Sequence, residues 1–115
     1  MARFDPAPYL PLTPAMFQVL VALADGEKHG YAVIKEVARR TDGKVRLRAG
    51  TLYTVIRRFV DDGLIQESSE RPDPALDDER RRYYRLTERG RAVAVAEARR
   101  MADTLAQARA KLGAI

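Results

Sequence analysis

Apolar residues recur at intervals of three and four along two segments in the first half of the chain, and this spacing predicts two amphipathic helices. The first begins after Thr13, a preferred N-cap residue, with Pro14 at the first helical position, and ends near Gly26. The second covers about residues 29–41 and ends before Gly43. The first helix is apolar around much of its circumference, which places it at the centre of the predicted core.

A third helix is predicted over residues 50–61, within the stretch GTLYTVIRRFVDDGLI. At 100° per residue, Leu52, Ile56 and Phe59 fall on one face of this helix. The opposite face is polar and consists of Gly50, Thr54, Arg57, Arg58 and Asp61. Gly63 is expected to end the helix. Because the apolar face packs on the core, the threonine and arginine face is predicted to point outward.

Alternation of apolar and polar residues predicts three short strands. The first is KVRLR at residues 44–48, the second begins at residue 64, and the third is RRRYYRL at residues 80–86. Residues 69–79, SERPDPALDDE, are polar and contain two prolines, so they are predicted to form a loop. The second and third strands then form a hairpin across this loop.

A last helix of about 25 residues is predicted to follow Thr87, its N-cap. Its apolar residues are spaced four, three, four, three and four apart, which is a heptad seam formed by Ala94, Ala98, Met101, Leu105, Ala108 and Leu112. A helix this long cannot cover its own seam, and isolated helices are marginal in water. The expected cover is the same helix, or the N-terminal arm, of a second copy; packing back on its own domain is the alternative.

The predicted order is helix, helix, short strand, helix, strand, loop, strand, long helix, which is an α+β and mostly α arrangement. Three helices followed by a hairpin outline a winged helix-turn-helix, here with a long C-terminal dimerisation helix. The predicted units are an N-terminal arm (1–12), a winged helix DNA-binding domain (13–86) and the dimerisation helix (87–115). In this fold the third helix enters the major groove and the hairpin lies beside it as a wing.

The composition fits one soluble domain, because 46% of the 115 residues are hydrophobic and 32% are charged. The absence of cysteine excludes disulfides and thiolate chemistry, and it fits a reducing compartment. No apolar run approaches the roughly 20 residues of a membrane span, and the N-terminus has no apolar signal core. The expected location is therefore the cytoplasm, with no membrane partner.

The net charge of +5 is unevenly distributed. Residues 61–79 carry eight acidic and one basic side chain, whereas the segments before and after them are basic. A basic chain with one acidic island suggests a polyanionic partner for part of the surface.

Three stretches, HGYAVIKEV (29–37), GTLYTVIRRFVDDGLI (50–65) and RRYYRLTERG (81–90), resemble the signature blocks of PadR-type bacterial transcriptional regulators. The short C-terminal helix resembles the smaller subgroup of that family. The resemblance implies a dimeric winged helix protein that binds DNA, often a repressor that a small molecule releases. The acidic wing departs from the family pattern. Either its tip points away from DNA, or Arg80, Arg81 and Arg82 make the contact and are neutralised by the acids in the free protein.

Thr54 and Arg57 lie one turn apart on the outward face, where arginine can grip guanine and threonine can contact a base or a thymine methyl. Tyr53, on the shoulder of the helix, is expected to pack on the core edge, either with its hydroxyl on a phosphate or by packing alone. Thr51 either caps the helix or binds phosphate. Arg46, Arg48 and Arg58 are candidate phosphate contacts, which would make binding salt-dependent. The alternative for each polar residue is an ordinary solvated surface.

The predicted function is a sequence-specific, double-stranded DNA-binding regulator, a dimeric repressor of pseudo-palindromic promoter DNA released by a small-molecule effector. One alternative is a ligand sensor with a multidrug-type cavity at the dimer interface. Another is a winged helix module that binds proteins without DNA. No enzymatic role or cofactor is predicted, because the chain has one histidine, no cysteine and no glycine-rich phosphate loop. That histidine, His29, is expected to cap or pack at a helix entry rather than bind metal.

Overall fold

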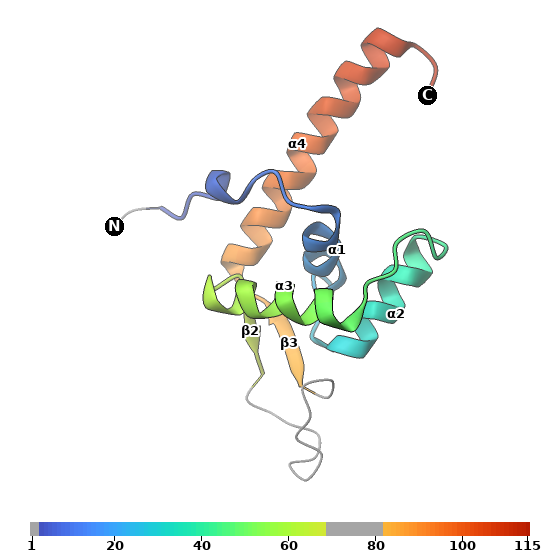
Figure 1. Cartoon of the computed structure of the whole chain (residues 1–115). Helices are drawn as coiled ribbons and strands as arrows, with labels where there is room; N and C mark the ends of the chain where they lie inside the picture. The colour runs from blue at the N-terminus through green and yellow to red at the C-terminus, as the bar shows by residue number, and fades with distance from the viewer. Residues whose placement is uncertain (1–2, 69–81) are drawn as a thin grey trace.

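The computed structural model describes residues 3–68 and 82–115 of the chain. Three helices pack together above a small sheet, and a fourth helix leaves this body and extends well beyond it (Figure 1). In chain order the elements are η1 (Ala7–Tyr9), α1 (Pro14–Ala22), β1 (Lys28–His29), α2 (Gly30–Arg40), α3 (Ala49–Asp61), β2 (Ile65–Glu67), β3 (Tyr83–Leu86) and α4 (Glu88–Leu112).

Side-chain caps fix the start of three helices. Thr13 Oγ1 accepts a hydrogen bond from Met16 N at 3.2 Å, and Thr87 Oγ1 accepts one from Gly90 N at 3.1 Å. His29 caps α2 in the same way, because its Nδ1 accepts from Ala32 N at 3.1 Å. The predicted caps at Thr13 and Thr87 and the predicted place of His29 at a helix entry are therefore confirmed.

Glycines lie beyond the ends of α2 and α3, as predicted. Gly43 and Gly63 have φ angles of +75° and +77°, a left-handed conformation that ends a helix without strain only at glycine. The first helix, by contrast, ends at Ala22, four residues before Gly26. Residues 23–26 form turns, in which Ala24 N donates to Val21 O.

The strand predicted at residues 44–48 is wrong. The Thr41 hydroxyl holds Val45 instead, accepting from its N–H at 3.0 Å and approaching its carbonyl at 3.3 Å, so this segment closes a loop on the end of α2. The buried Leu47 accounts for the apolar alternation without a sheet. The sheet has a different additional strand, β1, whose two residues Lys28 and His29 pair antiparallel with β3.

The predicted hairpin is confirmed. β2 pairs antiparallel with β3, with Ile65 opposite Leu86 and Gln66 opposite Arg85, and the strand order in the sheet is β1-β3-β2. The predicted loop at residues 69–79, with all five of its acidic side chains, lies outside the described residues, as do Arg80 and Arg81.

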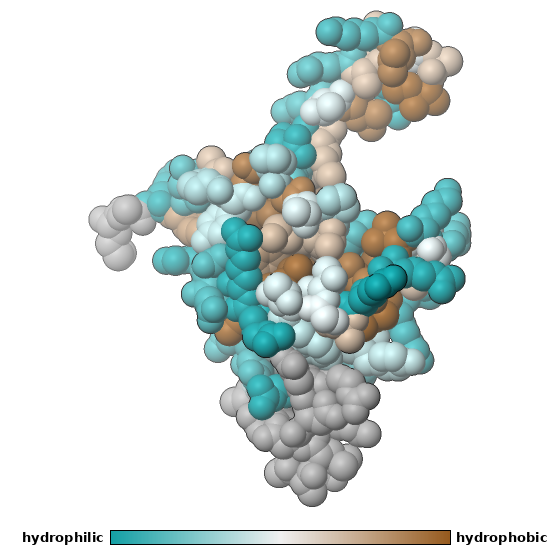
Figure 2. All heavy atoms as spheres, viewed as in Figure 1, coloured by the Kyte–Doolittle hydropathy of each residue, from teal (hydrophilic) through white to brown (hydrophobic). Residues whose placement is uncertain are grey.

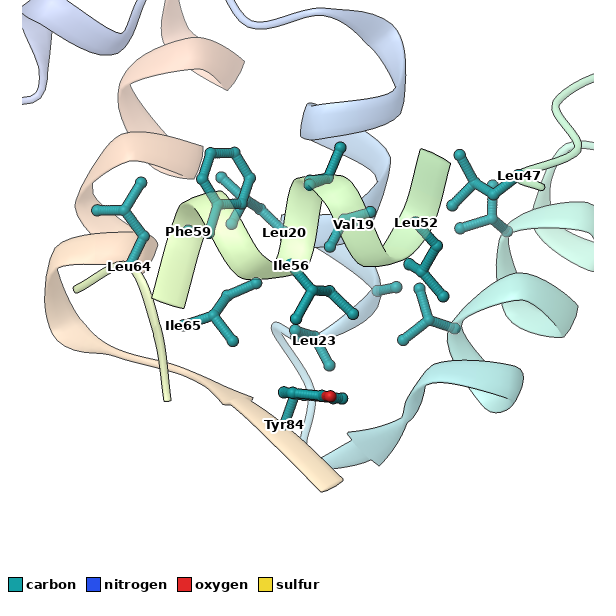
Figure 3. Close-up of a cluster of buried hydrophobic side chains, with 14 of the residues drawn as sticks. Val19, Leu20, Leu23, Leu47, Leu52, Ile56, Phe59, Leu64, Ile65 and Tyr84 are labelled. Carbon is teal, nitrogen blue, oxygen red and sulfur yellow. The ribbon is translucent and has the colours of Figure 1, made fainter. Parts of the chain in front are cut away.

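The core lies between α1, α3 and the sheet (Figure 3). Leu20 of α1 and Leu23, just after it, face Ile56 and Phe59 of α3, and each of these four side chains is at most 2% exposed. The central position predicted for the first helix is confirmed by this packing. The remaining buried hydrophobic residues of the core include Val19, Val33, Val37, Leu52, Leu64, Ile65, Tyr84 and Val93.

The two halves of α4 lie in different environments. In the first half Val93 is buried and Ala94 packs against the core. From residue 98 onward every residue except the half-buried Ala108 is exposed, so this part does not pack back on its own domain. We call residues 98–112 the distal rod. Within residues 3–68 and 82–115, the structure contains no helix that is both long and apolar enough to cross a bilayer.

Candidate nucleic-acid interface

The outward face of α3 is polar, as predicted. Leu52, Val55, Ile56 and Phe59 of this helix are buried. The exposed positions on the other side are Gly50, Thr51, Thr54, Arg57, Arg58, Val60 and Asp61. Figure 2 shows hydrophilic and neutral side chains over this part of the body, whereas hydrophobic ones gather at the far end of α4. The face carries cationic and hydroxyl groups, which can contact the phosphates and bases of a nucleic acid.

The two residues predicted to read bases lie one turn apart on this face. Thr54 Oγ1 donates to Gly50 O at 2.8 Å, and Arg57 Nε donates to Tyr53 O at 3.2 Å. The threonine methyl and an oxygen lone pair therefore remain for a partner. The Arg57 side chain lies back along the helix and would extend from it to reach a base edge in the major groove.

The N-terminus of α3 is open to an anion. Arg48 occupies the N-cap position and makes no side-chain capping bond, so Thr51 is not the cap of this helix. Arg46 and Arg48 are both exposed and directly precede the helix. The first-turn N–H groups of a helix carry partial positive charge, which adds to these two guanidinium groups. The arrangement fits the phosphate alternative for Thr51.

Tyr53 points inward, unlike the exposed polar residues of α3. It is 6% exposed and its hydroxyl oxygen is itself buried. Its ring covers Gly30 at the start of α2, where an added Cβ would lie 2.4 Å from that oxygen. This placement matches the packing alternative for Tyr53, and a contact between its hydroxyl and a phosphate stays a prediction.

Replacement of Gly30 by alanine is expected to lower the free energy of unfolding by about 1–3 kcal/mol, because the new methyl group overpacks against the Tyr53 ring. Gly50→Ala is the matched control: nothing lies within 4 Å of a Cβ at that helical position. Alanine there should raise stability by up to about 1 kcal/mol. Urea denaturation measures both changes, and equal effects at the two glycines would contradict the close contact.

On the wing, formed by β2 and β3, basic side chains meet partners within the hairpin. Arg82 Nε lies 3.5 Å from Glu67 Oε1, and Arg85 Nη2 donates to Gln66 Oε1 at 2.7 Å. The pair between Arg82 and Glu67 agrees with the idea that wing acids neutralise wing arginines in the free protein.

The predicted seam on α4 is uncovered for most of its length. Met101 and Leu105 are 42% and 43% exposed, and Leu112 is 73% exposed. Ala98 is exposed and Ala108 is half-buried on the same helix. Large apolar side chains left in water along one helix favour contact with a second surface.

Glu97 has a structural role that the sequence does not reveal. It is buried and accepts hydrogen bonds from Leu12 N, at 2.6 Å, and from Arg100 Nε, so it joins the N-terminal arm to α4. The bond from Arg100 lowers the pKa of the Glu97 carboxyl; burial opposes this shift and the Leu12 N–H supports it. A glutamate within a charged helix gives no sequence signal of burial.

The close contacts at Gly30 and Gly90, by contrast, could have been inferred from the sequence. Glycine inside a helix costs about 1 kcal/mol of stability relative to alanine, so its presence there indicates a close contact.

Within the part of the chain that the structure describes, no group of three or more histidine, cysteine or acidic residues could hold a metal ion.

Comparison with known proteins agrees with this geometry. The model of the transcriptional regulator PadR-like family matches residues 19–96. The transcriptional regulator Rv3488 of Mycobacterium tuberculosis is 38% identical over 89 residues, which cover 77% of this chain and 76% of the relative. Among solved structures, a PadR family transcription regulator from Clostridium difficile R20291 superposes with a TM-score of 0.70 at 22% identity, covering 88% of this chain and 100% of that one.

A further solved structure concerns regulation of the DNA binding of Bordetella bronchiseptica BpsR by 6-hydroxynicotinic acid. It is 32% identical, with a TM-score of 0.59, and the match covers 81% of this chain and 64% of that one. The three-helix body, the wing and the long last helix thus occur in a sequence that matches the family model over most of its length. This chain is a member of the PadR-like family of transcriptional regulators.

Proposed function

We propose that the chain is a cytoplasmic repressor that binds double-stranded DNA as a homodimer and reads a pseudo-palindromic promoter site. The observation that carries this proposal is the pair of uncovered faces at opposite parts of the molecule. One is the polar face of α3, and the other is the apolar seam of the distal rod. The first suits the major groove, and the second suits another copy of the same helix.

Base reading is assigned to Thr54 and Arg57, because both are exposed on α3 and lie on one turn. Phosphate contacts are assigned to the residues around them, namely Arg46, Arg48, Thr51 and Arg58. The open N-terminus of α3 supports the phosphate role of Thr51, since N–H groups without a capping side chain can bind an anion. Arg80, Arg81 and Arg82 of the wing are proposed to contact the flanking backbone.

A small-molecule effector is proposed to control DNA binding. This control is supported by the relative BpsR, a protein whose DNA binding is regulated by 6-hydroxynicotinic acid. An effector would release this protein from DNA if it bound more tightly to a dimer with a different spacing between its two α3 helices. A ligand-sensing cavity between the two distal rods would be a second way for a small molecule to change that spacing.

Arg57→Ala is expected to weaken operator binding by about 1–3 kcal/mol and to relax the preference at one base position. Arg58→Ala is the matched control: it removes the same guanidinium from the next residue, which is also exposed. Because Arg58→Ala would remove a phosphate contact, it should weaken binding to all sequences similarly. It should also reduce the slope of log affinity against log salt concentration by about 1.

The operator is first selected from a random duplex pool with the wild-type protein, and both variants are then titrated against it and against single-base changes. Equal sequence profiles for wild type and Arg57→Ala would contradict base reading by Arg57. A wild-type protein that enriches no sequence and binds no duplex at low salt would instead favour the protein-binding winged helix module.

A further inference from the structure

We propose that Thr87 and Gly90 determine which spacing between two DNA half-sites the protein binds. They would do so by holding the start of α4 rigidly against Gly63 and Leu64, which follow α3. The residues concerned are Gly63, Leu64, Thr87 and Gly90, which we call the α3–α4 joint. None of them lies on the outward face of α3 or on the seam. This inference rests on the proposed function, because it concerns how a dimer would present two recognition helices to DNA.

Leu64 is bonded to both helices through its backbone. Its N–H donates to Phe59 O of α3 at 2.8 Å, and its carbonyl accepts from Thr87 N at the start of α4 at 3.1 Å. The Leu64 side chain is completely buried in the core (Figure 3). A single buried residue, Leu64, therefore connects the end of the recognition helix to the beginning of the long helix.

Two further contacts tighten the joint. Thr87 Oγ1 donates to Gly63 O at 2.7 Å while it also caps α4 by accepting from Gly90 N. Gly90 then passes so close to the joint that an added Cβ would lie 2.1 Å from Leu64 O and 2.7 Å from the Leu86 side chain. Since the nearest atom belongs to the backbone, no side-chain rotation relieves that clash.

The rest of the first half of α4 is fixed to the same body. Arg91 Nη2 donates to Ala24 O at 2.8 Å, just after α1, and Glu97 accepts from Leu12 N just before α1. Bonds to the residues that flank α1 and the contacts at the joint leave α4 no hinge before the distal rod. The direction of the distal rod is therefore tied to the direction of α3.

Geometry gives the sensitivity of this device. α3 has 13 residues and is about 20 Å long, so a rotation of about 5° at the joint moves its far end by about 1.7 Å. In two copies related by a two-fold axis, the far ends of α3 then move relative to each other by up to about 3.4 Å, which is the rise of one base pair. Half-sites are read one helical turn, or a multiple of it, apart, so a change of this size alters which spacing fits best.

The test measures spacing rather than affinity alone. Wild-type protein first selects an operator from a random duplex pool, and duplexes are then made with its two half-sites moved apart or together in single-base-pair steps. Gly90→Ala is expected to keep the base preferences of each half-site but to shift the best spacing by about one base pair or to flatten the preference. A merely destabilising substitution would weaken binding at every spacing by one factor.

A second pair of variants covers the case in which Gly90→Ala does not fold, as judged by circular dichroism. Thr87→Val removes the hydroxyl but keeps its shape, whereas Thr87→Ser keeps the hydroxyl. The valine variant should show the altered spacing profile, and the serine variant should match the wild type. If the wild type prefers one half-site spacing sharply and Thr87→Val has the same spacing profile, as does Gly90→Ala where it folds, the inference is overturned. The proposed function would remain intact. A wild-type protein that selects no DNA would overturn both.

Discussion

Leu105→Glu is expected to leave the protein folded but monomeric. Leu105 lies in the middle of the predicted seam and is 43% exposed on an isolated chain. Full burial of a large apolar side chain contributes roughly 1.5–3 kcal/mol, and a carboxylate in its place would have to be buried opposite its own copy. In the proposed two-fold dimer each protomer would contribute the same position to the interface, so the substitution would act twice.

Operator affinity should fall with the loss of pairing. The affinity of two linked half-site contacts exceeds that of one by roughly 100-fold to 10,000-fold through effective concentration alone, so the expected loss of operator affinity lies in that range. Light scattering measures the mass, and a titration with the selected operator measures the affinity. Gln107→Glu is the matched control, since residue 107 is exposed and lies off the seam. A Leu105→Glu protein that keeps the wild-type mass would place the interface elsewhere.

Glu97→Ala is expected to lower the free energy of unfolding by about 2–4 kcal/mol, the largest stability effect predicted for this chain. The substitution leaves a buried Leu12 N–H without its acceptor and opens a cavity between the arm and α4. Asp103→Ala removes an acid from an exposed site on the same helix and should change stability little. Urea unfolding at pH 7 compares the two, and similar losses would contradict the structural role of Glu97.

The same residue should make stability depend on pH. Arg100 lowers the pKa of the Glu97 carboxyl below its usual 4.5, so the folded state favours the ionised form. The contribution of Glu97 is therefore complete above about pH 4.5 and is lost as the pH falls through the lowered pKa. In Glu97→Gln this loss is absent, so its stability deficit relative to wild type should shrink on acidification. Asp25, whose pKa is also lowered by a hydrogen bond from Lys28, is present in both proteins and cancels.

Most of the helical architecture could be predicted because it depends on local signals. Thr13 and Thr87 cap helices through hydroxyls that precede apolar periodic segments, and Gly43 and Gly63 have the positive φ angles that the pattern requires. The buried face of α3 also follows from spacing, since Leu52, Ile56 and Phe59 all point inward. These features involve residues a few positions apart, which is the range that periodicity measures.

The features that the sequence did not reveal depend on particular contacts that hydrophobic periodicity does not measure. Residues 44–48 alternate in polarity, but a hydroxyl at Thr41 determines their conformation. β1 has only two residues and exists because β3 pairs with it, so no alternation could indicate it. Glu97 is buried by an arm that lies 85 residues earlier in the chain. Tyr53 sits on the shoulder of its helix, where only the missing side chain of Gly30 decides that it turns inward.

The uneven attachment of α4 indicates where relatives could exchange parts. The bonds and the packing that attach α4 to the three-helix body lie within residues 88–97, whereas the distal rod is exposed except for the half-buried Ala108. A change of pairing partner during divergence could therefore proceed by replacing the last turns alone, with the fold of the head untouched. Replacement of the whole of α4, starting at its first turn, would also remove side chains that form part of the hydrophobic core.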